Sequence, residues 1–216
     1  MGLATGNTMI AVYQAWVKLA KMHPIHAETR GFNLDEYWPI EKKHPQSFYH
    51  FMEKNWRQPL QLSADRFRVP HGPNSLPEVE GYCQDWEREI QESGGVDIQL
   101  LGIGANGHIG FNEPSSAPDS RTRLVALTEQ TRARAGFQND AAPHQALTAG
   151  IGTILESKCI HILAFGKDKA DAVHAALEKT PHTSCPASFL HSHPDVTWHL
   201  DTDAASALKR NGRPPK

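Results

Sequence analysis

A histidine and a glutamate lie five residues apart in the stretch LLGIGANGHIGFNEP, which runs from Leu100 to Pro114. His108 titrates near neutral pH and Glu113 is a carboxylate, so together they can accept and donate protons. The same stretch contains four glycines, which permit tight turns and close approach of a ligand to the backbone. These glycines make a histidine that is merely packed and hydrogen-bonded the less favoured interpretation. The pattern predicts a proton-transfer site on a loop that follows a strand.

The glycine spacing does not indicate a dinucleotide site. A dinucleotide-binding loop continues into a helix, whereas Pro114 in FNEPSS stops one here. His191 and His193 in LHSHPD have the spacing of two metal ligands, but a third ligand is missing and a surface loop is the favoured alternative. We therefore expect neither NAD nor a metal.

Two segments have the composition of a phosphate site. In ATGNT, a small-residue turn before a helix exposes backbone N–H groups and the hydroxyls of Thr5 and Thr8 to an anion. The alternative is ordinary N-capping of that helix by Asn7 or Thr8. Lys169 in AFGKDKA lies at a strand-to-helix junction, where a lysine can bind a phosphate or simply face solvent.

Two adjacent acidic residues, Asp35 and Glu36, occur in GFNLDEYWPI just after a short expected strand. Their side chains point to opposite sides if the chain is extended, so only one can face a given pocket. A solvated acidic turn is the alternative interpretation.

The hydrophobic periodicity predicts an α/β fold, namely a three-layer, mostly parallel open sheet of Rossmann-like type with helices on both faces. Ligands of such sheets bind beyond the carboxyl ends of the strands, and the candidate residues all follow strands. The expected strands are DIQLLGIG, TRLVAL, CIHILAFG and VTWHL, and the expected helices cover residues 8–23, 79–90, 146–156, 167–178 and 203–210.

The chain of 216 residues is most simply one domain over residues 1–216. With 39% hydrophobic residues and a formal net charge of −2, it has no electrostatic bias toward nucleic acid or an anionic membrane. No apolar run approaches the ~20 residues that cross a bilayer. Three widely spaced cysteines favour free thiols in a reducing compartment, so we expect a cytosolic protein.

Several segments taken together resemble the glucosamine-6-phosphate deaminase family, also called glucosamine-6-phosphate isomerases. The resemblance follows the chain in order over nearly its whole length. Its most specific element is the ending FNEP, because the 6-phosphogluconolactonases share the glycine-histidine core but not that ending. The segments are LATGNT, FNLDEYW, HPQSFYHFM, GIGANGHIGFNEP, ALTAGIGTIL and HPDVTWHLD.

This resemblance implies conversion of glucosamine 6-phosphate and water into fructose 6-phosphate and ammonia without a cofactor. Asp35 would be the base that moves a proton from the second sugar carbon to the first. His108 would catalyse opening of the pyranose ring, with Glu113 close by to orient it. The phosphate would be held by Thr5, Gly6, Asn7, Thr8 and Lys169.

The sequence departs from the family pattern at several places. Asn106 stands where many relatives carry an aspartate that assists the histidine, and we count it as part of the catalytic group. The segment after Thr131 is short and lacks the expected phosphate-binding arginine, for which Arg134 is the nearest substitute. The helix and most of the strand that precede LATG in relatives are absent, so a central strand is expected to be short.

The sequence says least about effector regulation, oligomeric state and the choice of amino sugar. The effector site of some hexameric relatives would fall on Ser116, Arg123 and Val125, where valine replaces a lysine, so we expect an unregulated enzyme. Homo-oligomerisation and the choice between glucosamine and galactosamine stay open. The alternatives to the deaminase are a sugar-phosphate-binding homologue with little turnover and a hydrolase of the 6-phosphogluconolactonase type.

Overall fold

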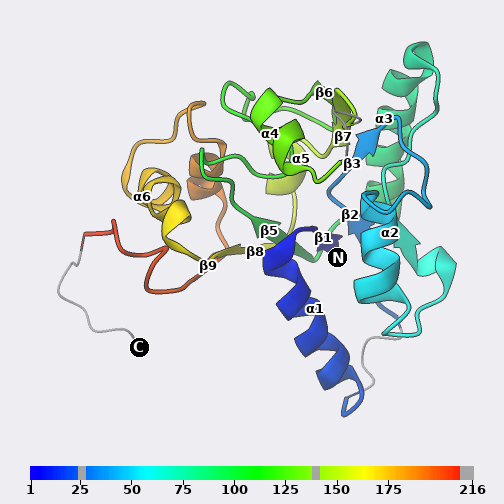
Figure 1. Cartoon of the computed structure of the whole chain (residues 1–216), viewed down its shortest axis with the longest axis horizontal. Coiled ribbons are helices and arrows are strands. Elements are labelled where there is room, and N and C mark those ends of the chain that lie inside the picture. The colour runs from blue at the N-terminus through cyan, green and yellow to red at the C-terminus, as the bar shows by residue number, and fades with distance from the viewer. Residues whose placement is uncertain (24–27, 138–141, 210–216) are drawn as a thin grey trace.

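The computed structural model describes residues 1–23, 28–137 and 142–209. Its centre is a parallel sheet of six strands in the order β4-β2-β1-β5-β8-β9. Figure 1 shows β9, β8, β5, β1 and β2 between α6 and α2. The α/β fold expected from the sequence is confirmed. The strands are β1 (Gly2–Leu3), β2 (Gly31–Asn33), β4 (Phe67–Arg68), β5 (Ile98–Gly102), β8 (Cys159–Ala164) and β9 (Val196–Leu200).

A second, antiparallel sheet corrects two expectations. It contains β3 (Asp35–Trp38), β7 (Gln145–Thr148) and β6 (Arg123–Ala126) in the order β3-β7-β6. TRLVAL therefore belongs to this small sheet and not to the parallel one. The helix expected over residues 146–156 is wrong for its first part, because Ala146 and Leu147 are fully buried in β7 between its two partners. Only α5 (Ile151–Leu155) is helical there.

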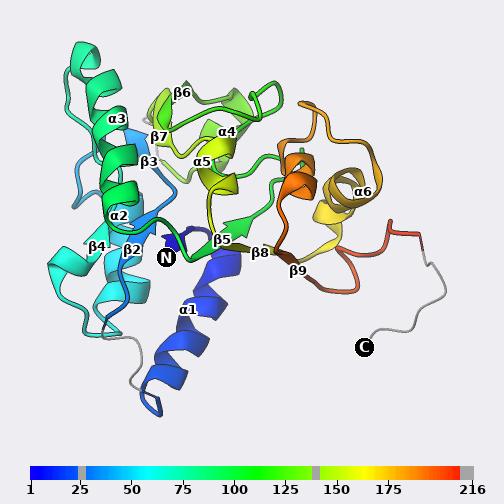
Figure 2. The ribbon, with the colours of Figure 1, turned by 180° about the vertical axis from the view of Figure 1, so that it is seen from behind.

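Helices cover both faces of the parallel sheet. Figure 2 shows α3 beside β2 at one end of the molecule and α6 beside β9 at the other, while α1 extends away from the sheet. The helices not yet bounded are α1 (Asn7–Ala20), α2 (Phe48–Met52), α3 (Leu76–Glu92), α4 (Glu129–Arg134) and α6 (Ala170–Glu178). A π-helical turn (Glu53–Arg57) and three 3₁₀ turns (Ala64–Arg66, Lys167–Lys169 and Pro186–Ser192) complete the set. None of the helices in the described ranges is long and apolar enough to cross a membrane.

Alternation along β5 explains how one sheet supports two cores. Leu100 packs in the cluster that contains Met9 and Tyr13 of α1, whereas Leu101 packs on the other face with Ile162 and Val173. Successive side chains of a strand point to opposite faces, so a near-continuous apolar run fills both layers. This packing fixes the carboxyl ends of the strands, where the loops with polar side chains begin.

Two further expectations concern the short central strand and the last described segment of the chain. The first is confirmed, because β1 has two residues and lies in the middle of the sheet, with Gly2 opposite both Phe32 of β2 and Gln99 of β5. The expected helix over residues 203–210 is absent from the described part, 203–209, which forms turns. The Asp201 carboxylate accepts the N–H groups of Gly166, at 2.9 Å, and Ala204, at 2.7 Å, and so holds the chain against the β8 loop.

Candidate active site

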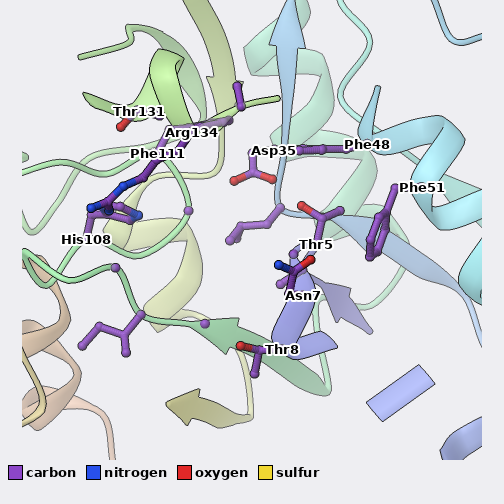
Figure 3. Close-up of a pocket in the computed structure, with 18 of the residues that line it drawn as sticks. Thr5, Asn7, Thr8, Asp35, Phe48, Phe51, His108, Phe111, Thr131 and Arg134 are labelled. Atoms are coloured by element: carbon purple, nitrogen blue, oxygen red, sulfur yellow. The ribbon is translucent and has the colours of Figure 1, made fainter. Parts of the chain in front are cut away.

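A cavity of about 740 Å³ opens at the carboxyl ends of β1, β5 and β8, beside the small antiparallel sheet. This volume falls within the usual range of small-molecule sites. Figure 3 shows Asp35 and His108 on either side of the space, with Thr5, Asn7 and Thr8 at the start of α1. The structure brings eight of the nine predicted site residues to its lining: Thr5, Gly6, Asn7, Thr8, Asp35, Asn106, His108 and Lys169.

The loop before α1 is free to bind a ligand because its polar groups do not cap the helix. The N-cap is Gly6, with φ of 103°, and no side chain makes a capping hydrogen bond. Capping by Asn7 or Thr8 is therefore wrong, since both lie within the helix and line the cavity. Tyr13 of α1 donates its hydroxyl hydrogen to the carbonyl oxygen of Ala4 at 2.6 Å, and this bond ties the loop to the helix. The result is a rigid turn that presents N–H groups at a helix start.

Lys169 adds a positive charge to the same end of the cavity. It closes the 3₁₀ turn that follows β8, and its Nζ lies 3.1 Å from the carboxylate of Asp168, which is largely exposed. Lys167, the other lysine of AFGKDKA, is not among the lining residues. An exposed ion pair contributes little to stability, so Lys169 can exchange Asp168 for a more highly charged anion at small cost.

Asp35 is a buried carboxylate that faces the cavity. It is the first residue of β3 and only 6% exposed, and its carboxylate has no hydrogen-bond donor among the described residues. Burial, together with the nearby charge of Glu36, raises the pKa of Asp35 to about 8. A carboxylate that is desolvated and free of donors is a strong base for its type.

Glu36 points to the opposite side of β3, as expected for an extended chain. Its carboxylate accepts hydrogen bonds from Ser47 Oγ at 2.7 Å and from the N–H groups of Phe48 and Tyr49, each at 2.9 Å. It is fully buried, so the alternative of a solvated acidic turn is wrong. Burial holds the pKa of Glu36 above its ordinary value despite these bonds. Glu36 thus anchors the start of α2 and is not available to a ligand.

The orientation of His108 follows from a chain of contacts through Asn106. The Nδ2 amide of Asn106 donates to Glu113 Oε2 at 2.7 Å, and Oδ1 of Asn106 lies 2.7 Å from Nδ1 of His108. A carboxylate only accepts hydrogen bonds, so the amide must face Glu113 and the amide oxygen must face the histidine. Nδ1 of neutral His108 therefore carries the hydrogen, and Nε2 carries the lone pair.

Glu113 acts on the histidine mainly through this amide. Its Oε2 lies 3.5 Å from Nδ1 of His108, beyond the 2.7 Å of the Asn106 contact, and Glu113 is not among the residues that line the cavity. The adjacent His108 has the largest effect and, with the hydrogen bonds from Thr131 and Asn106, lowers the pKa of Glu113 to about 2. The carboxylate is therefore ionised at neutral pH and holds the amide in one orientation.

The structure also shows residues that sequence reasoning missed or left undecided. Gly104 packs against the imidazole, because a Cβ there would lie 2.2 Å from Cε1 of His108. Arg134 lines the cavity, and Figure 3 shows its side chain reaching toward His108.

The two histidines with the spacing of metal ligands, His191 and His193, each contact a backbone carbonyl at 2.6 Å, of Ala176 and Ser157 respectively. No group of three or more metal-binding side chains occurs within residues 1–23, 28–137 and 142–209.

Comparison with known proteins agrees with this geometry. Residues 1–198 match the family described as glucosamine-6-phosphate isomerases/6-phosphogluconolactonase. The chain belongs to this family. The glucosamine-6-phosphate deaminase of Shewanella loihica is 44% identical over 212 residues, which cover 96% of this chain and 78% of that protein.

Solved structures of family members have the same fold. A monomeric glucosamine-6-phosphate deaminase superposes with a TM-score of 0.89 at 41% identity and covers 95% of this chain and 86% of its own. The 6-phosphogluconolactonase from Trypanosoma cruzi reaches a TM-score of 0.75 at 19% identity, with 96% of this chain and 83% of that chain covered. The lactonase likeness shows the shared fold alone, whereas the deaminase likeness extends to the sequence.

Proposed function

We propose that this protein converts glucosamine 6-phosphate and water into fructose 6-phosphate and ammonia. The observation that carries the proposal is the placement of Asp35, a buried carboxylate without a donor, across one cavity from His108. Abstraction of a carbon-bound proton needs such a base, whereas lactone hydrolysis needs only an activated water. The family membership and the deaminases at about 40% identity support the same reaction.

The phosphate is held at the start of α1. The N–H groups around Gly6, the hydroxyls of Thr5 and Thr8, and Lys169 form a site suited to a dianion. Binding energy from this remote group positions the sugar carbons between Asp35 and His108.

Ring opening is the first chemical step and is assigned to His108. The free lone pair on Nε2 takes the proton of the anomeric hydroxyl, and the same proton is returned to the ring oxygen as the bond between that oxygen and the first carbon breaks. Asn106 keeps Nδ1 protonated throughout and Glu113 keeps Asn106 in place. The open-chain aldehyde makes the hydrogen on the second carbon acidic.

Isomerisation is assigned to Asp35. Its carboxylate takes the proton from the second carbon and delivers it to the first carbon, and its raised pKa of about 8 makes it a better proton acceptor than an ordinary aspartate. The amino group passes one proton to the oxygen on the first carbon, which becomes a hydroxyl, and the nitrogen on the second carbon is then an imine. Addition of one water molecule and departure of ammonia leave the ketose phosphate, which balances the reaction.

The active unit is inferred to be a single chain. Every residue assigned here comes from one chain, and one deaminase of the same fold is described as monomeric. Specific activity should then be independent of protein concentration while light scattering reports the mass of one chain. A loss of specific activity on dilution, with a parallel fall in mass, would contradict this assignment.

The function is tested by measuring ammonia and ketose phosphate released from the 6-phosphates of glucosamine and galactosamine. Hydrolysis of 6-phosphogluconolactone is measured beside them. Equal amounts of ammonia and ketose phosphate are expected from at least one amino sugar, with no lactone hydrolysis above the spontaneous rate. Calorimetric binding of the sugar phosphate without turnover would favour the inactive homologue, and lactone hydrolysis alone would favour the hydrolase.

A further inference from the structure

Glu113 has a second hydrogen-bond donor, which comes from outside the catalytic loop. Thr131 of α4 donates its hydroxyl to Oε1 of Glu113 at 2.7 Å, while Asn106 occupies Oε2 at the same distance. Both oxygens of the carboxylate are therefore held, one from each side. The Glu113 side chain is only 15% exposed, so these two bonds exclude most of its contact with water.

The hydroxyl of Thr131 is itself held in direction by Thr128, the N-cap of α4. Thr128 Oγ1 donates to Thr131 Oγ1 at 2.9 Å and accepts the backbone N–H of Thr131 at 3.1 Å. Because Thr131 Oγ1 accepts that bond, its own hydrogen is directed to Glu113. The first turn of α4 thus determines where the Glu113 carboxylate lies.

We propose that Thr131 is a positioning residue for the reaction, acting on His108 through Glu113 and Asn106. The chain of bonds runs from Thr131 to Glu113, from Asn106 to Glu113, and from His108 to Asn106, each with a heavy-atom distance of 2.7 Å. A displaced Glu113 would leave the Asn106 amide held only by the backbone N–H of His108, at 3.2 Å, and a rotated amide would offer its own N–H to Nδ1. The ring would then have to take the other tautomer, with Nε2 protonated and unable to accept the anomeric proton.

The position of Thr131 on α4 links this chain to the wall of the cavity. Gln130, Thr131 and Arg134 all line the cavity, and no carboxylate among the described residues pairs with Arg134. Substrate contacts that move α4 therefore also move the Thr131 hydroxyl, which determines the tautomer of His108 through Glu113 and Asn106. This inference rests on the proposed function where it is tested by kcat and KM, but not where it is tested by NMR of the His108 tautomer.

The test compares Thr131→Val, which keeps the shape and removes the hydroxyl, with Thr131→Ser, which keeps the hydroxyl. Thr197→Val on the exposed side of β9 is the matched control. We expect Thr131→Val to lower kcat about tenfold, the equivalent of about 1.4 kcal/mol, with KM nearly unchanged. Thr131→Ser should restore most of the rate, and the control should match the wild type.

Two further readouts separate positioning from simple damage to the fold. Loss of a donor raises the pKa of Glu113, so the carboxyl ¹³C titration of Glu113 should move to higher pH in Thr131→Val alone. Two-bond ¹H–¹⁵N correlation of the imidazoles should show His108 protonated at Nδ1 in the wild type and mixed tautomers in Thr131→Val. The inference is overturned if the tautomer of His108, the titration of Glu113 and kcat are all unchanged, or if KM alone rises.

The spectroscopic arm also distinguishes this inference from the proposed function. If the wild type releases no ammonia but the tautomer of His108 changes in Thr131→Val, the function fails and the positioning role stands. If the wild type is active and the tautomer is indifferent to the hydroxyl, the function stands and the positioning role fails. Thermal melts of each variant show whether the fold is retained.

Discussion

Oδ1 of Asn106 lies 2.7 Å from Nδ1 of His108, and this contact fixes which nitrogen of the ring is free to act. The amide can serve this purpose because Glu113 accepts its N–H and leaves only the oxygen for the ring. A carboxylate at position 106 would have no N–H for Glu113. Asparagine is therefore a matched part of this loop and not a degraded aspartate.

Replacement of this amide by a carboxylate tests that conclusion. Asn106→Asp removes the donor to Glu113 and adds a like charge, so the pKa of Glu113 should rise from about 2. The carboxyl ¹³C titration of Glu113 measures this shift directly, whereas the acid limb of kcat/KM follows Asp35. Asn106→Ala, which breaks the link without adding charge, is the control and should lower kcat with a smaller shift. An unchanged Glu113 titration in Asn106→Asp would show that the amide does not donate to it.

Asp35→Asn should abolish isomerisation and leave phosphate-dependent binding nearly intact. An amide keeps the shape of the side chain but cannot accept the carbon-bound proton, and loss of a general base typically costs ~10²- to 10⁴-fold. Hydrogen–deuterium exchange at the second sugar carbon, followed by NMR, measures this step apart from ammonia release. The wild-type kcat/KM should rise with pH through about 8, where Asp35 loses its proton. Near-normal turnover in Asp35→Asn, with Glu36→Gln inactive, would move the base by one residue.

The same substitution should stabilise the fold in a pH-dependent way. The pKa of Asp35 is raised from an ordinary 3.8 to about 8, so unfolding releases a proton between these values and wild-type stability falls as pH rises. Relative to the wild type, Asp35→Asn should gain little below pH 4 and on the order of 3–5 kcal/mol by pH 7. Urea unfolding at several pH values measures the difference. A constant difference across this range would mean that the carboxyl is not desolvated in the folded state.

Much of this site could be expected from the sequence because its residues are local to short motifs. His108, Asn106 and Glu113 lie within one loop, and alternation along an extended chain places Asp35 and Glu36 on opposite sides of β3. Sequence periodicity also places the apolar runs of β5 and β8 in a buried parallel sheet.

The parts that were wrong depend on contacts between distant segments. The segment of residues 145–148, QALT, is short and only half apolar, and only pairing with β3 and β6 makes it a strand. Residues 203–209 have helical composition, but the bonds that Asp201 makes hold the chain in turns. Thr131 reaches Glu113 from another element, and neither composition nor spacing marks a threonine as the partner of a carboxylate 18 residues away.

Gly104→Ala should inactivate the protein without removing any chemical group. The added Cβ would lie 2.2 Å from Cε1 of His108, far inside van der Waals contact, so the imidazole must move away and break its bond to Asn106. A displacement of about 1 Å in a catalytic group can cost ~10²-fold in rate. The backbone at this position has no positive φ, so the fold itself should be retained. Gly81→Ala in α3, where an added Cβ meets nothing within 4 Å, is the control and should be fully active and slightly more stable. Measured together, kcat and thermal midpoints decide the matter: an active Gly104→Ala would mean that His108 tolerates displacement and is not the group that opens the ring.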